Sequence, residues 1–313
     1  MFPPVLLLAA VAVGTVPGAA ALASARWTYR SPAAAILLWQ ALGLSWGLAA
    51  VGALAGLGAV RGRWGVAGGA LPGAADALHD AALGSAAAVM GAFARLAFLL
   101  AGAALLALLC WVLLAASATV LLARRRHRTL LSLLAHGDPK VPGALVVDSP
   151  AAAAYCVPGL RSRIVVSAGT LALLDSAELA AVLAHERAHL RARHDLVLLP
   201  FSALSRAFPR SRLVRHAHAE VALLVEMLAD DRALRHRPAR ELATALLRVG
   251  ASGAGQAPSG ALAAVTAPEG ETVARVSRLL APVPRLPAPA LALIWSSAAA
   301  LVVIPVAVLL LPL

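Results

Sequence analysis

The chain has 313 residues, of which 61% are hydrophobic and only 13% are charged. Because soluble domains contain roughly 45–50% apolar and about 25% charged residues, this composition argues against a purely soluble globular protein and indicates that part of the chain lies in a lipid bilayer. The formal net charge is +12, but no nucleic-acid-binding motif accompanies it, and we expect no direct binding of nucleic acid.

Four windows without Asp, Glu, Lys or Arg predict four transmembrane helices. Each window is 25 to 30 residues long, which exceeds the roughly 20 residues needed to cross the hydrocarbon. Backbone polar groups cannot stay unpaired in lipid, so we expect each window to be helical. The windows are Met1–Ala25, Ser31–Val60, Leu96–Ala123 and Leu286–Leu313.

The residues that flank these windows predict the orientation of the spans. Seven basic residues flank the spans on one side of the membrane, whereas Arg61, Arg63 and Arg95 lie in a short loop on the other. Cytoplasmic flanks are enriched in Arg and Lys, so we expect both termini outside and the segment Arg124–Arg285 in the cytoplasm.

A cleaved signal peptide is the alternative interpretation of the first window. Ala23-Ser24-Ala25 resembles a small-residue cleavage site, and cleavage would invert the orientation of everything downstream. No basic residue precedes Arg26, however, so the positively charged start of a signal peptide is missing. We therefore favour a retained first helix.

The segment 124–285 has the pattern of a folded, water-exposed domain. It holds 22 of the 27 basic and 13 of the 15 acidic residues, and its basic excess is expected beside anionic lipid headgroups. We divide the chain into a membrane region with three spans (1–123), this domain (124–285) and a fourth span (286–313). Ala144–Asp148 and Arg161–Ser167, both bounded by Pro and Gly, predict a small β element, which we interpret as a hairpin.

The rest of this domain is predicted to be helical. Asp175 or Ser176 is an N-cap candidate, and Glu178 completes a capping box, so a helix is expected over Ser176–Leu198, before Pro200. Further helices are expected from Pro209 and Ser211 to about Arg235, from Pro238 to near Gly250, and over the amphipathic run Val273–Leu280. Ala251–Gly270 is rich in Gly, Ala, Pro and Ser and is predicted to be a loop.

The motif His185-Glu186-Arg187-Ala188-His189 carries the predicted chemistry. On a helix His189 lies only about 40° round the axis from His185, so both imidazoles project on one side as candidate metal ligands. Glu186 lies about 100° from His185, where it can act as a general base on a water molecule instead of binding the metal.

A third ligand is expected because catalytic zinc sites use three protein ligands and one open position. Glu226 and Asp230 are again four residues apart, and we predict Glu226 as the ligand and Asp230 as the acceptor that orients a ligating imidazole. The alternative is that both acids are solvated charges that pair with Arg232 and Arg235. Asp231 points away, about 140° from Glu226.

Other histidines are not expected to bind the metal. On a continuous helix His194 would lie about 180° from His185, which excludes it as a ligand. His216, His218 and Arg215 are near Glu226 in sequence but are interpreted as surface residues of a basic helix.

These residues resemble the signatures of the integral-membrane zinc metallopeptidases of the gluzincin type, which include HtpX, the CAAX prenyl endopeptidase and the BlaR/MecR antirepressor peptidases. Leu183–His189 is similar to the zinc helix of these enzymes, and Glu226–Asp230 is similar to their downstream Glu-x-x-Ala-Asp motif. Ile164–Leu174 resembles more weakly the strand and turn before that helix, so the resemblance covers roughly residues 140–280. A catalytic domain between the third and fourth spans is most similar to the BlaR/MecR arrangement.

The resemblance implies a mainly α protein with four transmembrane helices and a cytoplasmic α+β zincin-like metallopeptidase domain between the third and fourth. It implies a multi-pass protein of the cytoplasmic membrane with one Zn²⁺ per chain, held by His185, His189 and Glu226, and Glu186 as the base. Its substrates would be peptide bonds of cytosolic or membrane-proximal proteins, with a transcriptional repressor as one candidate.

Two further hypotheses accompany this interpretation. A substrate peptide could align by adding a strand to the β element near Arg161–Ser167, because strand addition recurs in peptide recognition. A catalytically silent scaffold or a small-molecule transporter is the alternative class of function, but the four windows contain none of the charged residues that mark transport pathways.

Overall fold

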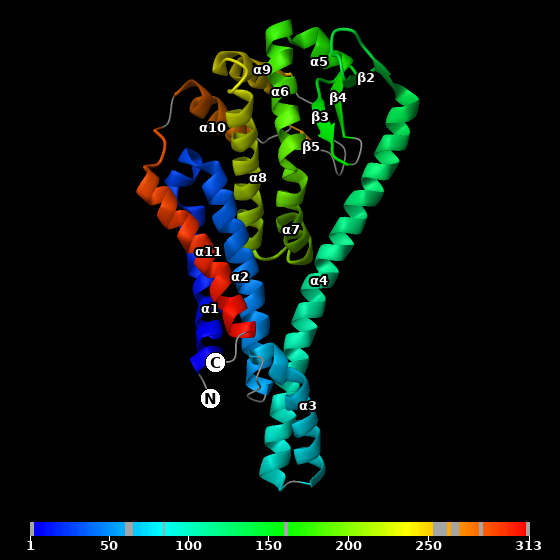
Figure 1. The fold of residues 1–313 in the computed structure, drawn as a ribbon. Coiled ribbons are helices and arrows are strands. Elements are labelled where there is room, and N and C mark those ends of the chain that lie inside the picture. Colours follow the sequence, from blue (N-terminus) through cyan, green and yellow to red (C-terminus); the bar gives the residue numbers. More distant parts are fainter. Residues whose placement is uncertain are drawn as a thin grey trace. The chain divides into compact units, whose positions relative to one another are not determined.

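The computed structural model describes residues 3–59, 65–83, 85–159, 162–252, 262–263, 269–281 and 284–310. Most of these residues are helical, and the chain divides into two compact units (Figure 1). The first unit comprises Met1–Thr28, Ala34–Leu113 and Leu286–Leu313, and the second comprises Tyr29–Ala33 and Leu114–Arg285.

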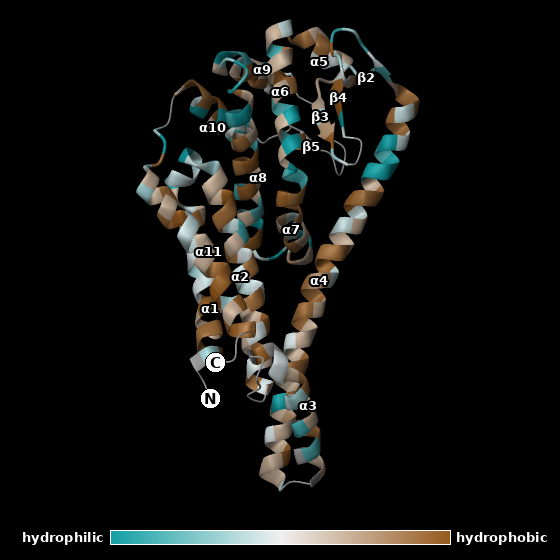
Figure 2. Ribbon diagram, viewed as in Figure 1, coloured by the Kyte–Doolittle hydropathy of each residue, from teal (hydrophilic) through white to brown (hydrophobic). Residues whose placement is uncertain are grey.

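Four helices of the described chain are long and apolar enough to cross a membrane, which confirms that the four predicted windows are helical. Hydrophobic residues colour long stretches of these helices (Figure 2). They are α1 (Pro3–Ala23), α2 (Pro32–Gly58), α4 (Ala86–Leu134) and α11 (Ala288–Leu310).

Within the first unit, small residues let three of these helices approach closely. Leu8 of α1, Ala49 of α2 and Val308 of α11 form one buried cluster. A Cβ atom on Gly52 would lie 2.6 Å from Leu309 Cδ2, so a larger residue at this position would require the Leu309 side chain to move.

The connection expected around Arg61–Arg95 is mostly helical in the part that the structure describes, and its side of the membrane stays a prediction. Helix α3 spans Gly65–Leu83, and α4 begins at Ala86, ten residues before the predicted third span. The helix α4 also continues through Arg124 to Leu134. Arginine has a high helix propensity, so the arginine run ends the apolar window without ending the helix.

The second unit contains a five-stranded sheet with the order β1-β2-β4-β3-β5. Its strands are β1 (Ala135–Gly137), β2 (Ala144–Val147), β3 (Ala154–Val157), β4 (Arg163–Ser167) and β5 (Leu262–Ala263). The predicted hairpin is wrong in its pairing, because β2 and β4 are parallel and β3 pairs antiparallel with β4. All four residues of β3 are buried, so the strand has no polar alternation that would mark it in the sequence.

The position of β4 limits where a substrate strand could be added. Strand β4 is hydrogen-bonded to β2 on one side and to β3 on the other, so an added strand cannot pair with the described part of β4 itself. Addition of a strand elsewhere on this β element stays a prediction, and Leu160 and Arg161 lie outside the described residues.

Helices pack on the sheet and on one another to form the rest of the second unit. The capping box at the start of α6 is confirmed. The Asp175 carboxylate accepts a hydrogen bond from the backbone N–H of Glu178, and the Glu178 carboxylate accepts one from the backbone N–H of Asp175. The predicted starts at Ser211 and Pro238 and the amphipathic helix are also confirmed. The helices are α5 (Ala168–Leu173), α6 (Ser176–Ala192), α7 (His194–Ala207), α8 (Arg212–Ala233), α9 (Ala239–Ala251) and α10 (Glu269–Leu280).

The single helix predicted over Ser176–Leu198 is wrong, because it breaks at Arg193. This residue has φ 51° and ψ 44°, and its backbone N–H bonds back to the carbonyls of His189 and Leu190. Helix α7 then runs through Pro200 to Ala207. Of the predicted loop Ala251–Gly270, residues 253–261 and 264–268 lie outside the described residues.

Two buried clusters hold the helices that carry the candidate site. One joins the sheet to α6 and α9 and includes Val146, Cys156, Val166 and Val182. The other joins α6, α8, α9 and α10 and includes Leu242. Helices α6 and α8 are thereby fixed side by side at the centre of the unit.

Candidate metal centre

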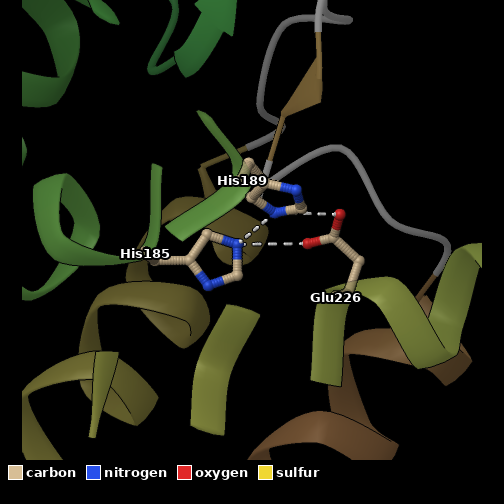
Figure 3. Close-up of side chains that lie close together, drawn as sticks. All are labelled: His185, His189 and Glu226. Atoms are coloured by element: carbon tan, nitrogen blue, oxygen red, sulfur yellow. Dashed lines mark hydrogen bonds and ion pairs between the residues drawn. The ribbon is translucent and has the colours of Figure 1, made fainter. Parts of the chain in front are cut away.

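Helix α6 brings two histidines to one point. His185 and His189 lie one turn apart, are completely buried, and place their Nε2 atoms 2.9 Å from each other (Figure 3). The spacing of four residues puts both rings on the same side of the helix, as the sequence predicted.

Helix α8 supplies a carboxylate at the same point. Glu226 Oε2 lies 3.3 Å from His185 Nε2, and Glu226 Oε1 lies 3.4 Å from His189 Nε2 (Figure 3). The three donor atoms lie within 4.8 Å of one another, so this trio could hold a metal ion.

The donor set fits zinc. Nitrogen and oxygen ligands lie about 2.0–2.2 Å from zinc in a tetrahedral site, which puts two ligand atoms about 3.3–3.6 Å apart. The two imidazole-to-carboxylate distances agree with that separation, and the nitrogens are slightly closer. Two imidazoles and a carboxylate are also the protein ligands that a catalytic zinc site uses, leaving a fourth position for water.

Asp230 lies on the far side of His185. Its Oδ1 is 2.8 Å from His185 Nδ1, and the carboxylate is almost completely buried. In the neutral form of the His185 ring, a proton held on Nδ1 by this carboxylate leaves the Nε2 lone pair free for a metal ion. Glu226 and Asp230 therefore do not pair with Arg232 and Arg235, and the alternative of two solvated acids is wrong.

Arg275 of α10 completes this arrangement and was missed in the sequence. Its guanidinium donates to both carboxylate oxygens of Asp230, at 2.9 and 2.7 Å, and its Nη1 lies 3.2 Å from Glu226 Oε2. Arg275 is only 1% exposed. The signal in the sequence was a charge on the apolar face of an amphipathic helix, four residues before Leu279.

These contacts set the protonation of the buried groups. Burial alone would raise the pKa of both acids, but the charges of His189 and Arg275 hold the pKa of Glu226 well below its usual value. Arg275 lowers that of Asp230 to about 2. Burial alone would lower the pKa of His185, but hydrogen bonds to Asp230 and Glu226 outweigh it and raise this pKa to about 9.

His194 lies beside the second histidine of the trio because of the break at Arg193. His194 Nδ1 is 3.0 Å from His189 Nδ1, and Arg232 Nη1 is 3.3 Å from His194 Nε2. His194 is outside the trio, as expected, but the reason given from a continuous helix is wrong. Its pKa falls to about 3, first because the ring is buried and then because of the charges of His189 and Arg232.

Glu186 is completely buried next to β3. The pKa of the Cys156 thiol is raised first by burial and then by the charge of Glu186 and a hydrogen bond to it. Glu186 is therefore a buried carboxylate one residue from a candidate ligand, and its role as a general base stays a prediction.

The remaining predicted side chains lie apart from the trio. His216 is exposed and faces Glu220 at 3.8 Å, and His218 bonds to Ser202 at 3.1 Å. Asp231 pairs with Arg278.

The site thus resembles the metallopeptidase centres that are built on an HExxH helix and a downstream Glu. The family model described as Peptidase family M48 matches residues 121–227, about a third of the chain, which includes α6 and most of α8. The resemblance to gluzincin-type membrane metallopeptidases is confirmed at the level of this family, and the subgroup stays a prediction. No curated protein and no solved structure matches the chain.

Proposed function

We propose that the protein is a zinc-dependent endopeptidase embedded in the cytoplasmic membrane, which hydrolyses peptide bonds of cytosolic or membrane-proximal proteins. The observation that carries the proposal is the convergence of His185, His189 and Glu226 next to the buried Glu186. The match to Peptidase family M48 and the four apolar helices support it.

The proposed mechanism assigns one task to each of these residues. His185, His189 and Glu226 would hold one zinc ion per chain, and Asp230 would fix the tautomer of His185. When bound, zinc lowers the pKa of water and polarises a substrate carbonyl. Glu186 takes one proton from the attacking water and gives it to the leaving amine, so the C–N bond breaks while a C–O bond forms.

The burial of these residues favours the reaction. Charges interact more strongly where water is excluded, and the contacts to Asp230 and Arg275 hold the trio before a substrate arrives. Little reorganisation is then needed during the reaction.

The location of the reaction is proposed from the flanking arginines. Their distribution supports a cytoplasmic catalytic domain between the third and fourth spans. The four spans are expected to lie in a lipid bilayer. A narrower form of the proposal names a transcriptional repressor as the substrate.

The proposal is tested with Glu186→Gln in host cells, at matched membrane levels and with Glu241→Gln as a matched control on α9. Newly formed protein N-termini are counted by quantitative mass spectrometry, and zinc is measured in the purified proteins. We expect Glu186→Gln to keep its zinc and to lose about 10²–10⁴-fold of the cleavage rate, while Glu241→Gln cleaves normally. Indistinguishable N-termini from wild type and Glu186→Gln would contradict the proposal and favour a silent scaffold.

A further inference from the structure

A second polar feature of the domain is a cavity of about 250 Å³ between α6 and the end of α8. Three alanines of α6 leave room for it, and the other lining side chains are all basic. The lining residues are Ala184, Ala188, Arg191, Ala192, Arg232, Arg235 and His236.

In the part of the chain that the structure describes, the arginines of this cavity form no ion pair with an acidic side chain. Among the described residues, none of the ion pairs to a carboxylate involves Arg191, Arg232 or Arg235. The two acids next to Arg232 in sequence are engaged elsewhere, because Asp230 pairs with Arg275 and Asp231 pairs with Arg278.

Two of the guanidinium groups also repel each other. The pKa of Arg232 is lowered first by burial and then by the charge of Arg235. A helix C-terminus favours one nearby cation, but it does not explain three arginines around one hollow. Arg232 is partly buried, so an anion held between these guanidinium groups would offset their repulsion.

We propose that this cavity binds the phosphate group of an anionic ligand. Guanidinium groups present paired N–H donors that match phosphate oxygens, and the walls hold three of them. The volume is smaller than that of most sites for drug-sized ligands, so it suits a phosphate with a small substituent. The phosphate could belong to a lipid headgroup or to a soluble compound, and this proposal does not depend on the proposed peptidase activity.

The test uses the full-length protein in a phosphate-free detergent and two probes. Inorganic phosphate is titrated by isothermal calorimetry, and bound phosphatidylglycerol is counted by native mass spectrometry after extraction from bilayers of phosphatidylcholine and phosphatidylglycerol. The pocket variant is Arg191→Gln with Arg235→Gln, because both side chains are exposed and neither contacts the metal trio. The control is Arg212→Gln with Arg240→Gln, which removes the same charge from exposed positions that do not line the cavity.

We expect one saturable phosphate per chain, with affinity that falls roughly tenfold or more in the pocket variant and stays unchanged in the control. Loss of one phosphatidylglycerol in the pocket variant alone, without binding of free phosphate, would support a lipid headgroup as the source. Equal weakening in both variants would show diffuse attraction and overturn the proposal. Absence of saturable binding in both arms would also overturn it.

Discussion

Arg275→Met tests whether the guanidinium of Arg275 stabilises the candidate metal centre. The wild-type side chain is buried and makes two charge-assisted hydrogen bonds to Asp230, at 2.9 and 2.7 Å. Each such bond contributes about 1.5–3 kcal/mol, and removing one partner of a buried ion pair costs about 3–5 kcal/mol. For a unit of this size the loss lowers the melting temperature by about 6–20 °C.

The unfolding of this unit can be followed through Cys156, because none of the six tryptophans lies between Arg124 and Arg285. Cys156 is completely buried in the core, whereas Cys110 is exposed on α4. In a Cys110→Ala background, a maleimide dye that fluoresces on reaction with thiols therefore reports exposure of Cys156 alone. Heating the detergent-solubilised protein with this dye gives the melting temperature of the second unit.

The matched control is Arg278→Met on the same helix. Arg278 also pairs with a carboxylate, but its partner Asp231 is 36% exposed, so we expect a smaller loss than for Arg275→Met. The double variant Arg275→Met with Asp230→Asn should recover part of the loss, because position 230 then carries no buried charge without its guanidinium partner. Equal melting temperatures for Arg275→Met and Arg278→Met would refute the reasoning.

Three more predictions follow from single positions. Asp230→Asn should weaken zinc binding about 10–100-fold, as measured by competition with a chromogenic chelator; an unchanged affinity would contradict its orienting role. Glu220→Gln should raise the melting temperature at pH 8 but not at pH 4, because burial raises the pKa of Glu220 and the folded state is destabilised by its charge above that pKa; the opposite pH dependence would contradict this. Gly169→Ala should cost about 1–3 kcal/mol because the new Cβ meets the Pro150 carbonyl, whereas Gly270→Ala on α10 meets no atom within 4 Å and should be tolerated.

The starts of the helices were predictable because their signals are local. The capping box of Asp175 and Glu178 and the N-cap Ser211 involve residues at most three apart. The break at Arg193 was not predictable, because arginine rarely adopts a left-handed conformation. A long-range contact accompanies it, since the next acid, Asp195, pairs with Arg124 of α4 at 3.0 Å.

The site was predictable to the extent that it depends on helical spacing. The trio and Asp230 come from two pairs of residues four apart, on α6 and on α8. Arg275 was missed because its place depends on the docking of α10. The contact of His194 with His189 was missed because it depends on the turn after α6. Charge compensation in a buried site requires such long-range partners, and spacing within one helix does not show them.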